Sequence, residues 1–120
     1  MFRKVCEFKM HRDLQETLYE KYDKLFRQRN LSPSETCMCW GIAIGDGWYD
    51  IIDELCYRIQ TYVVHHNIKQ PEFSQIKSKF GKLVIYMDDE DDYIRGLISM
   101  ACGFACRVDE KKKSKNWRSG

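Results

Sequence analysis

The stretch WGIAIGDGWYDIIDELCYRIQTYVV, residues 40–64, decides the fold. It begins as a short apolar run, turns at Gly45-Asp46-Gly47 and continues as a long amphipathic segment. In this second part apolar side chains recur every three or four residues, as on the buried face of a helix: Trp48, Ile51, Ile52, Leu55, Cys56, Ile59, Tyr62 and Val63. The stretch therefore predicts a strand, a tight glycine turn and a central helix, with Asp46 as the N-cap of that helix.

Two further helices are expected, one on each side of the central stretch. The apolar spacing over residues 11–29 predicts the first, which ends at Asn30. The second begins at the acidic run 88–92, DDEDD, with Asp88 or Asp89 as its N-cap. Its apolar positions predict one buried stripe: Ile94, Leu97, Ile98, Ala101, Ala105 and Val108.

A β-hairpin is predicted around Gly81, from residues 73–80 and 83–87. The first run alternates in part, which places three side chains on the face opposite the lysines: Ile76, Ser78 and Phe80. The second run is almost continuously apolar, as in a strand that is covered on both faces. Residues 37–44 predict another short strand, and residues 1–10 either an edge strand or a poorly ordered terminus.

These elements predict one α+β domain over residues 1–110, followed by a basic flexible tail over 111–120. We expect a small antiparallel or mixed sheet with a hairpin, packed against about three helices. The net charge of +2 is too small to indicate a polyanion partner by itself. No apolar run approaches the roughly 18 residues that span a bilayer. The first ten residues do not resemble a signal peptide, so we expect a cytoplasmic protein with reduced cysteines.

Several motifs carry a resemblance. Gly45-Asp46-Gly47-Trp48, Asp53-Glu54-Leu55-Cys56 and the run 76–83, IKSKFGKL, followed by Tyr86, resemble a family of small uncharacterised bacterial and phage proteins. The likeness covers about residues 19–105. It implies the same fold and no assigned activity. It also implies that a phage-encoded protein acting in the host cytoplasm is a reasonable expectation.

The candidate ligand site combines the glycine-rich turn with the lysines of the hairpin. Such a turn can present backbone amides to an anion, aromatic rings can stack on a base, and lysines can bind phosphates. The alternative is a helix cap with a core tryptophan and a solvated strand face. The ligand-binding prediction comprises Trp40, Asp46, Gly47, Trp48, Tyr49, Lys77, Lys79 and Lys82.

Three other groups of residues could carry chemistry, and each also has a purely structural explanation. Asp50, Asp53 and Glu54 share one helix face and could hold a divalent cation or act as an acid–base pair. The run 88–92 could bind a cation, although it lacks the EF-hand pattern. Cysteines and histidines could bind zinc, but their spacing differs from the usual arrangement: Cys37, Cys39, Cys102, Cys106, His65 and His66. We therefore predict no catalytic residue, metal or cofactor.

Three functions remain from the sequence. The first is a non-catalytic binding protein that holds a small anionic, nucleotide-like ligand, and that sequesters a host signalling nucleotide to counter host defence if a phage encodes it. The second is a protein–protein interaction module or inhibitor that binds a host protein. The third, least supported, is a metal-dependent hydrolase. A small domain with several amphipathic faces is also expected to form a homo-oligomer.

Overall fold

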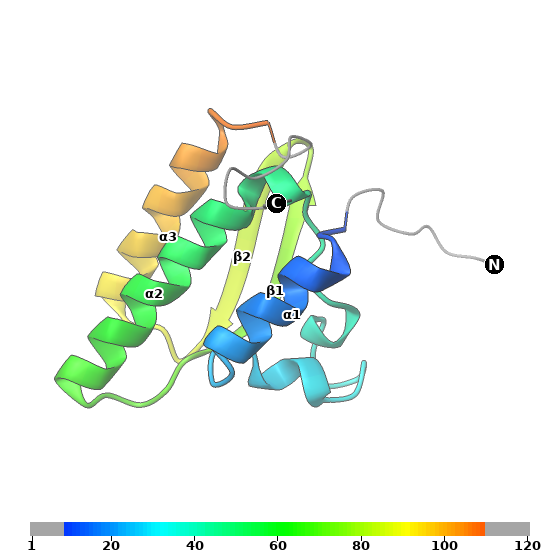
Figure 1. The fold of residues 1–120 in the computed structure, drawn as a ribbon. Helices are drawn as coiled ribbons and strands as arrows, with labels where there is room; N and C mark the ends of the chain where they lie inside the picture. Colours follow the sequence, from blue (N-terminus) through cyan, green and yellow to red (C-terminus); the bar gives the residue numbers. More distant parts are fainter. Residues whose placement is uncertain (1–8, 110–120) are drawn as a thin grey trace.

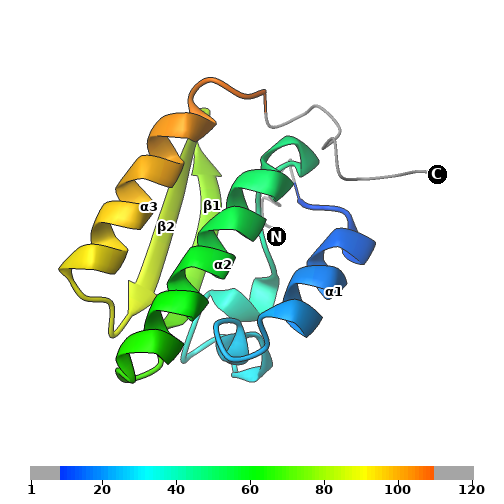
Figure 2. The same ribbon diagram turned by 60° about the vertical axis from the view of Figure 1, so that its left-hand side comes forward.

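The computed structural model describes residues 9–109. Figures 1 and 2 show two helices, α2 and α3, side by side over one face of a β-hairpin, with α1 beside α2. The described elements are α1 (Arg12–Lys21), η1 (Arg27–Asn30), η2 (Met38–Trp40), η3 (Asp46–Trp48), α2 (Tyr49–His66), β1 (Glu72–Lys79), β2 (Lys82–Asp88) and α3 (Asp92–Ala105), where η marks a 3₁₀ turn. Three helices and an antiparallel hairpin confirm the α+β prediction. The predictions for residues 1–8 and 110–120 lie outside the described residues.

The central helix is confirmed with the bounds Tyr49–His66. Asn67 ends it in the left-handed conformation, with φ of 50°, which asparagine tolerates better than most residues. One face of α2 is buried in the core, between α3, the hairpin and α1 (Figure 1). The buried residues of that face are Tyr49, Ile52, Leu55, Cys56, Ile59 and Val63.

The predicted strand over residues 37–44 is wrong. Residues 38–40 form the turn η2, and Gly41 follows with φ of +92°. Thr36 fixes this turn, because its hydroxyl accepts from the backbone N of Met38 and donates to the carbonyl of Ser74. Beyond the turn, a single parallel bridge joins Ala43 to Lys77 on β1.

The first helix is shorter than predicted and ends at Lys21. The chain then turns, and Leu25 and Phe26 are fully buried beyond the end of the helix. Phe26 packs on Phe73 of β1, with ring centroids 5.0 Å apart, and the carbonyl of Leu25 accepts from the backbone N of Phe73. Tertiary packing therefore overrides the helical spacing after residue 21.

The predicted hairpin is confirmed, and Ile76 and Ser78 lie opposite the lysines as predicted, but Phe80 and the covering of β2 differ from the prediction. Ile76 pairs with Ile85 and Ser78 with Leu83 on the side toward the helices, and the register shifts between Phe73 and Gln75. The opposite side is open to solvent, so β2 is covered on one face only: Tyr86 is 52% exposed. Phe80 does not join Ile76 in the sheet but lies in the turn, with its side chain 93% exposed.

The N-cap of α3 is Asp91, which corrects the prediction of Asp88 or Asp89. The Asp91 carboxylate accepts from the backbone N of Ile94 at 2.9 Å and from the Tyr62 hydroxyl at 2.6 Å. Asp88 instead accepts from the Gln28 side chain at 2.7 Å. Val108 lies beyond the end of α3 and is exposed, whereas the other five positions of the predicted stripe are buried or half-buried.

The Tyr62–Asp91 hydrogen bond predicts a pH-dependent contribution to stability. The Tyr62 hydroxyl, followed by the backbone N of Ile94, lowers the pKa of Asp91 below its ordinary value. A lowered folded-state pKa stabilises the fold above the unfolded pKa of about 3.9, and this contribution is lost as the pH falls through the folded pKa. Tyr62→Phe should therefore lower the free energy of unfolding at pH 7 and have less effect at pH 3, as measured by urea denaturation.

The matched control is Tyr57→Phe on the same helix, because within residues 9–109 the Tyr57 hydroxyl makes no hydrogen bond. This control should change stability little at either pH. An equal loss for Tyr62→Phe at pH 7 and pH 3 would show that the bond does not favour the ionised carboxylate.

Candidate functional site

Trp48 and Tyr49, two of the three aromatic residues of the predicted ligand site, lie in the core. Trp48 is 1% exposed, and its indole Nε1 donates to the carbonyl of Val108 at 2.7 Å. Tyr49 is also buried, and this burial, followed by the charge of Asp53, raises its pKa. A base could stack on either ring only by displacing core side chains, so both residues are explained by packing.

Asp46 connects two helices and does not cap its own. Its Oδ1 accepts from the backbone N of His11 at 2.7 Å, and His11 is the N-cap residue of α1. No side chain caps η3 or α2, so the prediction of Asp46 as the N-cap of α2 is wrong. Gly47 is buried in the same turn. The turn therefore fixes the start of α1 against the start of α2.

Two carboxylates on the acidic face of α2, Asp53 and Glu54, bond to different partners. Asp53 accepts from Lys21 Nζ at 2.6 Å and from the Tyr22 hydroxyl at 3.0 Å, which connects α2 to α1. Burial and this carboxylate together raise the pKa of Tyr22. Glu54 pairs with Arg58 on the exposed surface at 2.6 Å. Across residues 9–109, no three potential ligands from His, Cys, Asp and Glu gather around one point.

The cysteines of the described chain lie in different environments. Cys56 is fully buried, which raises the pKa of its thiol and explains it as a core residue. Cys37 and Cys106 are exposed, and Cys39 and Cys102 are half-buried. Cys39 donates to the carbonyl of Thr36.

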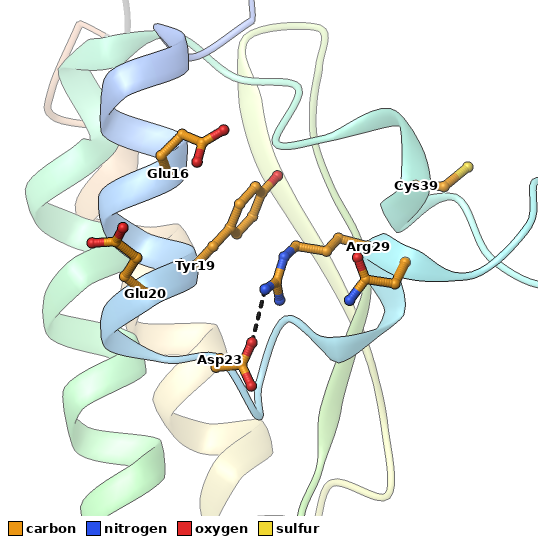
Figure 3. A pocket seen from close by; sticks show the side chains of 7 residues that line it. Glu16, Tyr19, Glu20, Asp23, Arg29 and Cys39 are labelled. Carbon is orange, nitrogen blue, oxygen red and sulfur yellow. Dashed lines mark hydrogen bonds and ion pairs between the residues drawn. The ribbon is translucent and has the colours of Figure 1, made fainter.

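A shallow pocket of about 530 Å³ lies between α1 and the η1–η2 region. Figure 3 shows Glu16 and Glu20 on α1 at its rim, with Arg29 pointing toward Asp23. Arg29 bonds to Asp23 at 2.7 Å and lies 4.8 Å from the centroid of the Tyr19 ring. Because the charge of Arg29 is already paired, the pocket is net acidic and does not suit an anion.

The lysines of the predicted site gather on the open face of the hairpin. Lys79 pairs with Lys82 directly across the strands, beside the turn. Lys77 lies next along β1, and its Nζ is 5.8 Å from the centroid of the Tyr86 ring. Within residues 9–109 none of the three lysines forms a salt bridge. The open face therefore carries three uncompensated cations and one half-exposed aromatic ring.

Phe80, which was predicted to lie in the sheet beside Ile76, is the most exposed large apolar side chain of residues 9–109. Phe80 and Gly81 form the two-residue turn, and both have positive φ, 53° and 78°. Such a turn favours Asn-Gly or Gly-Gly, so a bulky aromatic residue at its first position is unusual. The spacing Lys79-Phe80-Gly81-Lys82 was a signal for this turn, since two residues ending in glycine separate the two strand patterns. We call Lys77, Lys79, Phe80, Lys82 and Tyr86 the hairpin patch.

The structure brings the predicted residues together only in part. The GDGW turn and the hairpin tip lie at the same end of the molecule (Figure 1), but the side chains of Trp48 and Tyr49 are buried. Trp40 is 62% exposed at the end of η2. Trp40 lies away from the hairpin tip. Ala43 is bridged in parallel to Lys77, so the residues before Ala43 run alongside the earlier part of β1, far from its turn.

Comparison of the chain with protein-family models, with curated proteins and with solved structures found no match. The resemblance to a family of bacterial and phage proteins therefore stays a prediction. In the described part of the chain, no helix is long and apolar enough to cross a membrane.

The Asp46–His11 bond predicts how substitutions of Asp46 affect stability. Asp46→Ala removes the acceptor and should lower the free energy of unfolding by about 1 kcal/mol, the usual value of a bond at a helix start. Asp46→Asn keeps an oxygen acceptor and should cost less. Thermal or urea unfolding of the three proteins measures both effects. If Asp46→Ala were as stable as the original protein, the bond would contribute nothing to the fold.

Proposed function

We propose that this protein is a non-catalytic binding protein whose hairpin patch holds a small anionic, nucleotide-like ligand. The single observation that carries the proposal is the exposed aromatic side chain of Phe80 between Lys79 and Lys82, in a turn where its backbone is strained. In this arrangement Phe80 stacks on a base, and the lysines bind phosphate oxygens. The patch itself contains no carboxylate, histidine or cysteine side chain.

The charge of the patch supports an anionic ligand. Like charges directly opposite one another on an antiparallel pair destabilise a hairpin, and Lys79 lies opposite Lys82. The acids of the same hairpin, Glu72 and Asp88, lie at its other end, where they bond to Arg27 and Gln28. The repulsion between the lysines is therefore not relieved within residues 9–109, and a bound phosphate would relieve it.

The conformation of Phe80 supports the stacking role. For a non-glycine residue the left-handed region costs about 1–2 kcal/mol, and Asn tolerates it better than Phe. The Phe80 side chain gains no burial in return. Exposed aromatics beside lysines are the usual elements of stacking sites for bases. A ligand contact therefore gives a reason for a residue that the fold itself does not use.

A protein–protein interaction module remains a second proposal. It is favoured by an exposed apolar groove between α2 and α3, on the helical side of the sheet. A metal-dependent hydrolase has less support, because Asp53 and Glu54 are bonded to neighbouring side chains. The sequestering of a host signalling nucleotide is one use of the binding activity and rests on the predicted phage origin alone.

The proposal predicts opposite effects of Phe80→Asn on stability and on binding. Asparagine fits the first position of the turn, so the free energy of unfolding should rise by about 1 kcal/mol. Removing the ring should weaken ligand binding by roughly tenfold or more, since stacking contributes about 1–3 kcal/mol per base. Isothermal titration calorimetry with ATP, cyclic dinucleotides and a short single-stranded oligonucleotide measures binding, and urea unfolding measures stability.

Two controls separate the contribution of the Phe80 ring to binding from that of the lysine charges. Inorganic triphosphate lacks a base, so Phe80→Asn should not change its binding, whereas Lys79→Gln/Lys82→Gln should weaken all the ligands. Lys24→Gln, at an exposed lysine outside the patch, should change none of them. If the original protein gave no heat with any of the probes, or if Phe80→Asn bound nucleotides unchanged, the proposal would be wrong.

A further inference from the structure

The hairpin patch belongs to a longer row of side chains on the open face of the hairpin. Every second residue of each strand points to this face. From the turn inward, the pairs on it are Lys79–Lys82, Lys77–Val84 and Gln75–Tyr86. None of these six side chains is acidic. We call this row, with Phe80 at its outer end, the hairpin strip.

The two aromatic side chains of the hairpin strip are too far apart for one base to contact both. A strand rises about 3.4 Å per residue. Gln75 and Lys79 differ by four residues, so the level of Tyr86 lies about 14 Å from the last pair before the turn. Phe80 lies beyond that pair and is 93% exposed, and Tyr86 is 52% exposed. A single base can therefore stack on either ring but not on both.

Cations lie between the two rings. Lys79 and Lys82 lie next to Phe80, and Lys77 lies between this pair and the level of Tyr86. The Lys77 Nζ is 5.8 Å from the centroid of the Tyr86 ring. None of the three lysines is engaged in a salt bridge in the described part of the chain. Each ring thus has a lysine beside it, which matches the alternation of bases and phosphates along a nucleotide chain.

An acidic pair ends the hairpin strip. Glu72 lies opposite Asp88 beyond the level of Tyr86. Glu72 pairs with Arg27, whereas Asp88 accepts from the neutral Gln28 side chain and forms no salt bridge within residues 9–109. The remaining negative charge repels phosphates, so a bound chain ends near Tyr86. A stacked strand advances about 3.4 Å per nucleotide, so the hairpin strip takes no more than about six nucleotides.

We propose that the hairpin strip binds a short single-stranded segment of nucleic acid. One base stacks on Phe80, another stacks on Tyr86, and the phosphates between them contact Lys77, Lys79 and Lys82. This inference rests on the proposed function, because it uses the same patch, and it adds that the ligand is a chain of nucleotides. A duplex does not suit the site, since only unpaired bases can be splayed apart onto separate aromatic rings.

The first experiment measures how affinity depends on the length of the ligand. Isothermal titration calorimetry of the full chain uses thymidylates of one to ten nucleotides at one fixed salt concentration. The affinity should rise at least about tenfold between one and six nucleotides, because a second stacked base adds roughly that factor. It should rise only slightly beyond six. Uridylates should bind within a few-fold of thymidylates of equal length, since both present base faces and phosphates.

The second experiment tests the inner ring. Tyr86→Leu keeps an apolar residue in β2 and should weaken binding of the hexathymidylate roughly tenfold. It should leave binding of the mononucleotide unchanged, because that ligand binds at Phe80 between Lys79 and Lys82. The matched control is Tyr57→Leu on α2, whose side chain is similarly exposed at 55% and lies outside the hairpin strip. This control should change the binding of neither ligand.

The results separate this inference from the proposed function. If the mononucleotide bound as tightly as the hexathymidylate, or if Tyr86→Leu left the hexathymidylate unchanged, the inference would be overturned and the proposed function would stand. If no thymidylate bound, the inference would fall, and the proposed function would fall with it only if ATP and cyclic dinucleotides also gave no heat.

Discussion

Burial of one face of α2 is the constraint on which the rest of the structure depends. A two-stranded hairpin is marginally stable by itself and needs a packed face. Here Ile76 and Leu83 supply that face, and the core that they join includes Ile52 and Ile59 of α2, which are fully buried. Helices α1 and α3 lie on either side of α2 (Figure 2). The opposite face of the hairpin is open to solvent and carries the proposed ligand site.

Buried polar side chains fix the segments that have no regular structure. Gln15 is the clearest case: its amide donates to the carbonyl of Met10 at 2.7 Å and its oxygen accepts from the backbone N of Ile42 at 3.0 Å. Thr36 and Gln28 act similarly on the bulge of β1 and on the open end of the hairpin. Every buried side-chain nitrogen or oxygen in the described chain has a partner. Bonds of this kind stabilise mainly by avoiding the cost of an unpaired buried group.

The helix and the hairpin that depend on residues close together in the sequence were predicted correctly. The apolar spacing of Ile52, Leu55 and Ile59 indicated α2, and Gly81 between two apolar runs indicated the hairpin. The short strand over residues 37–44 failed because its conformation depends on Thr36 bonding to Ser74, 38 positions away. The end of α1 failed for a similar reason, since Phe26 leaves the helical path to pack on Phe73. Contacts between distant residues leave little trace in a single sequence.

The structure brings together only some of the residues that the sequence assigned to one ligand site. Lysines on one strand face are visible as an alternation, and Lys77, Lys79 and Lys82 do gather on the open side. A tryptophan after a glycine turn gives no sign of whether its ring points to solvent or to the core, and Trp48 points to the core. Asp46 looked like a local cap because its partner, His11, is 35 positions away. Phe80 was not included in the predicted site because the alternation placed it on the strand face of Ile76, away from the lysines.

The most direct test of ligand binding at the hairpin patch is a nuclear magnetic resonance titration of the ¹⁵N-labelled protein with a nucleotide. Binding at the hairpin patch should change the chemical shifts of the backbone amides of residues 77–86. The chemical shift of the Trp48 indole Nε1–H, which donates to the carbonyl of Val108, should not change. Shifts of the Trp48 indole and of the GDGW turn, with an unchanged hairpin tip, would contradict the assignment of Trp48 to the core and of the ligand to the hairpin.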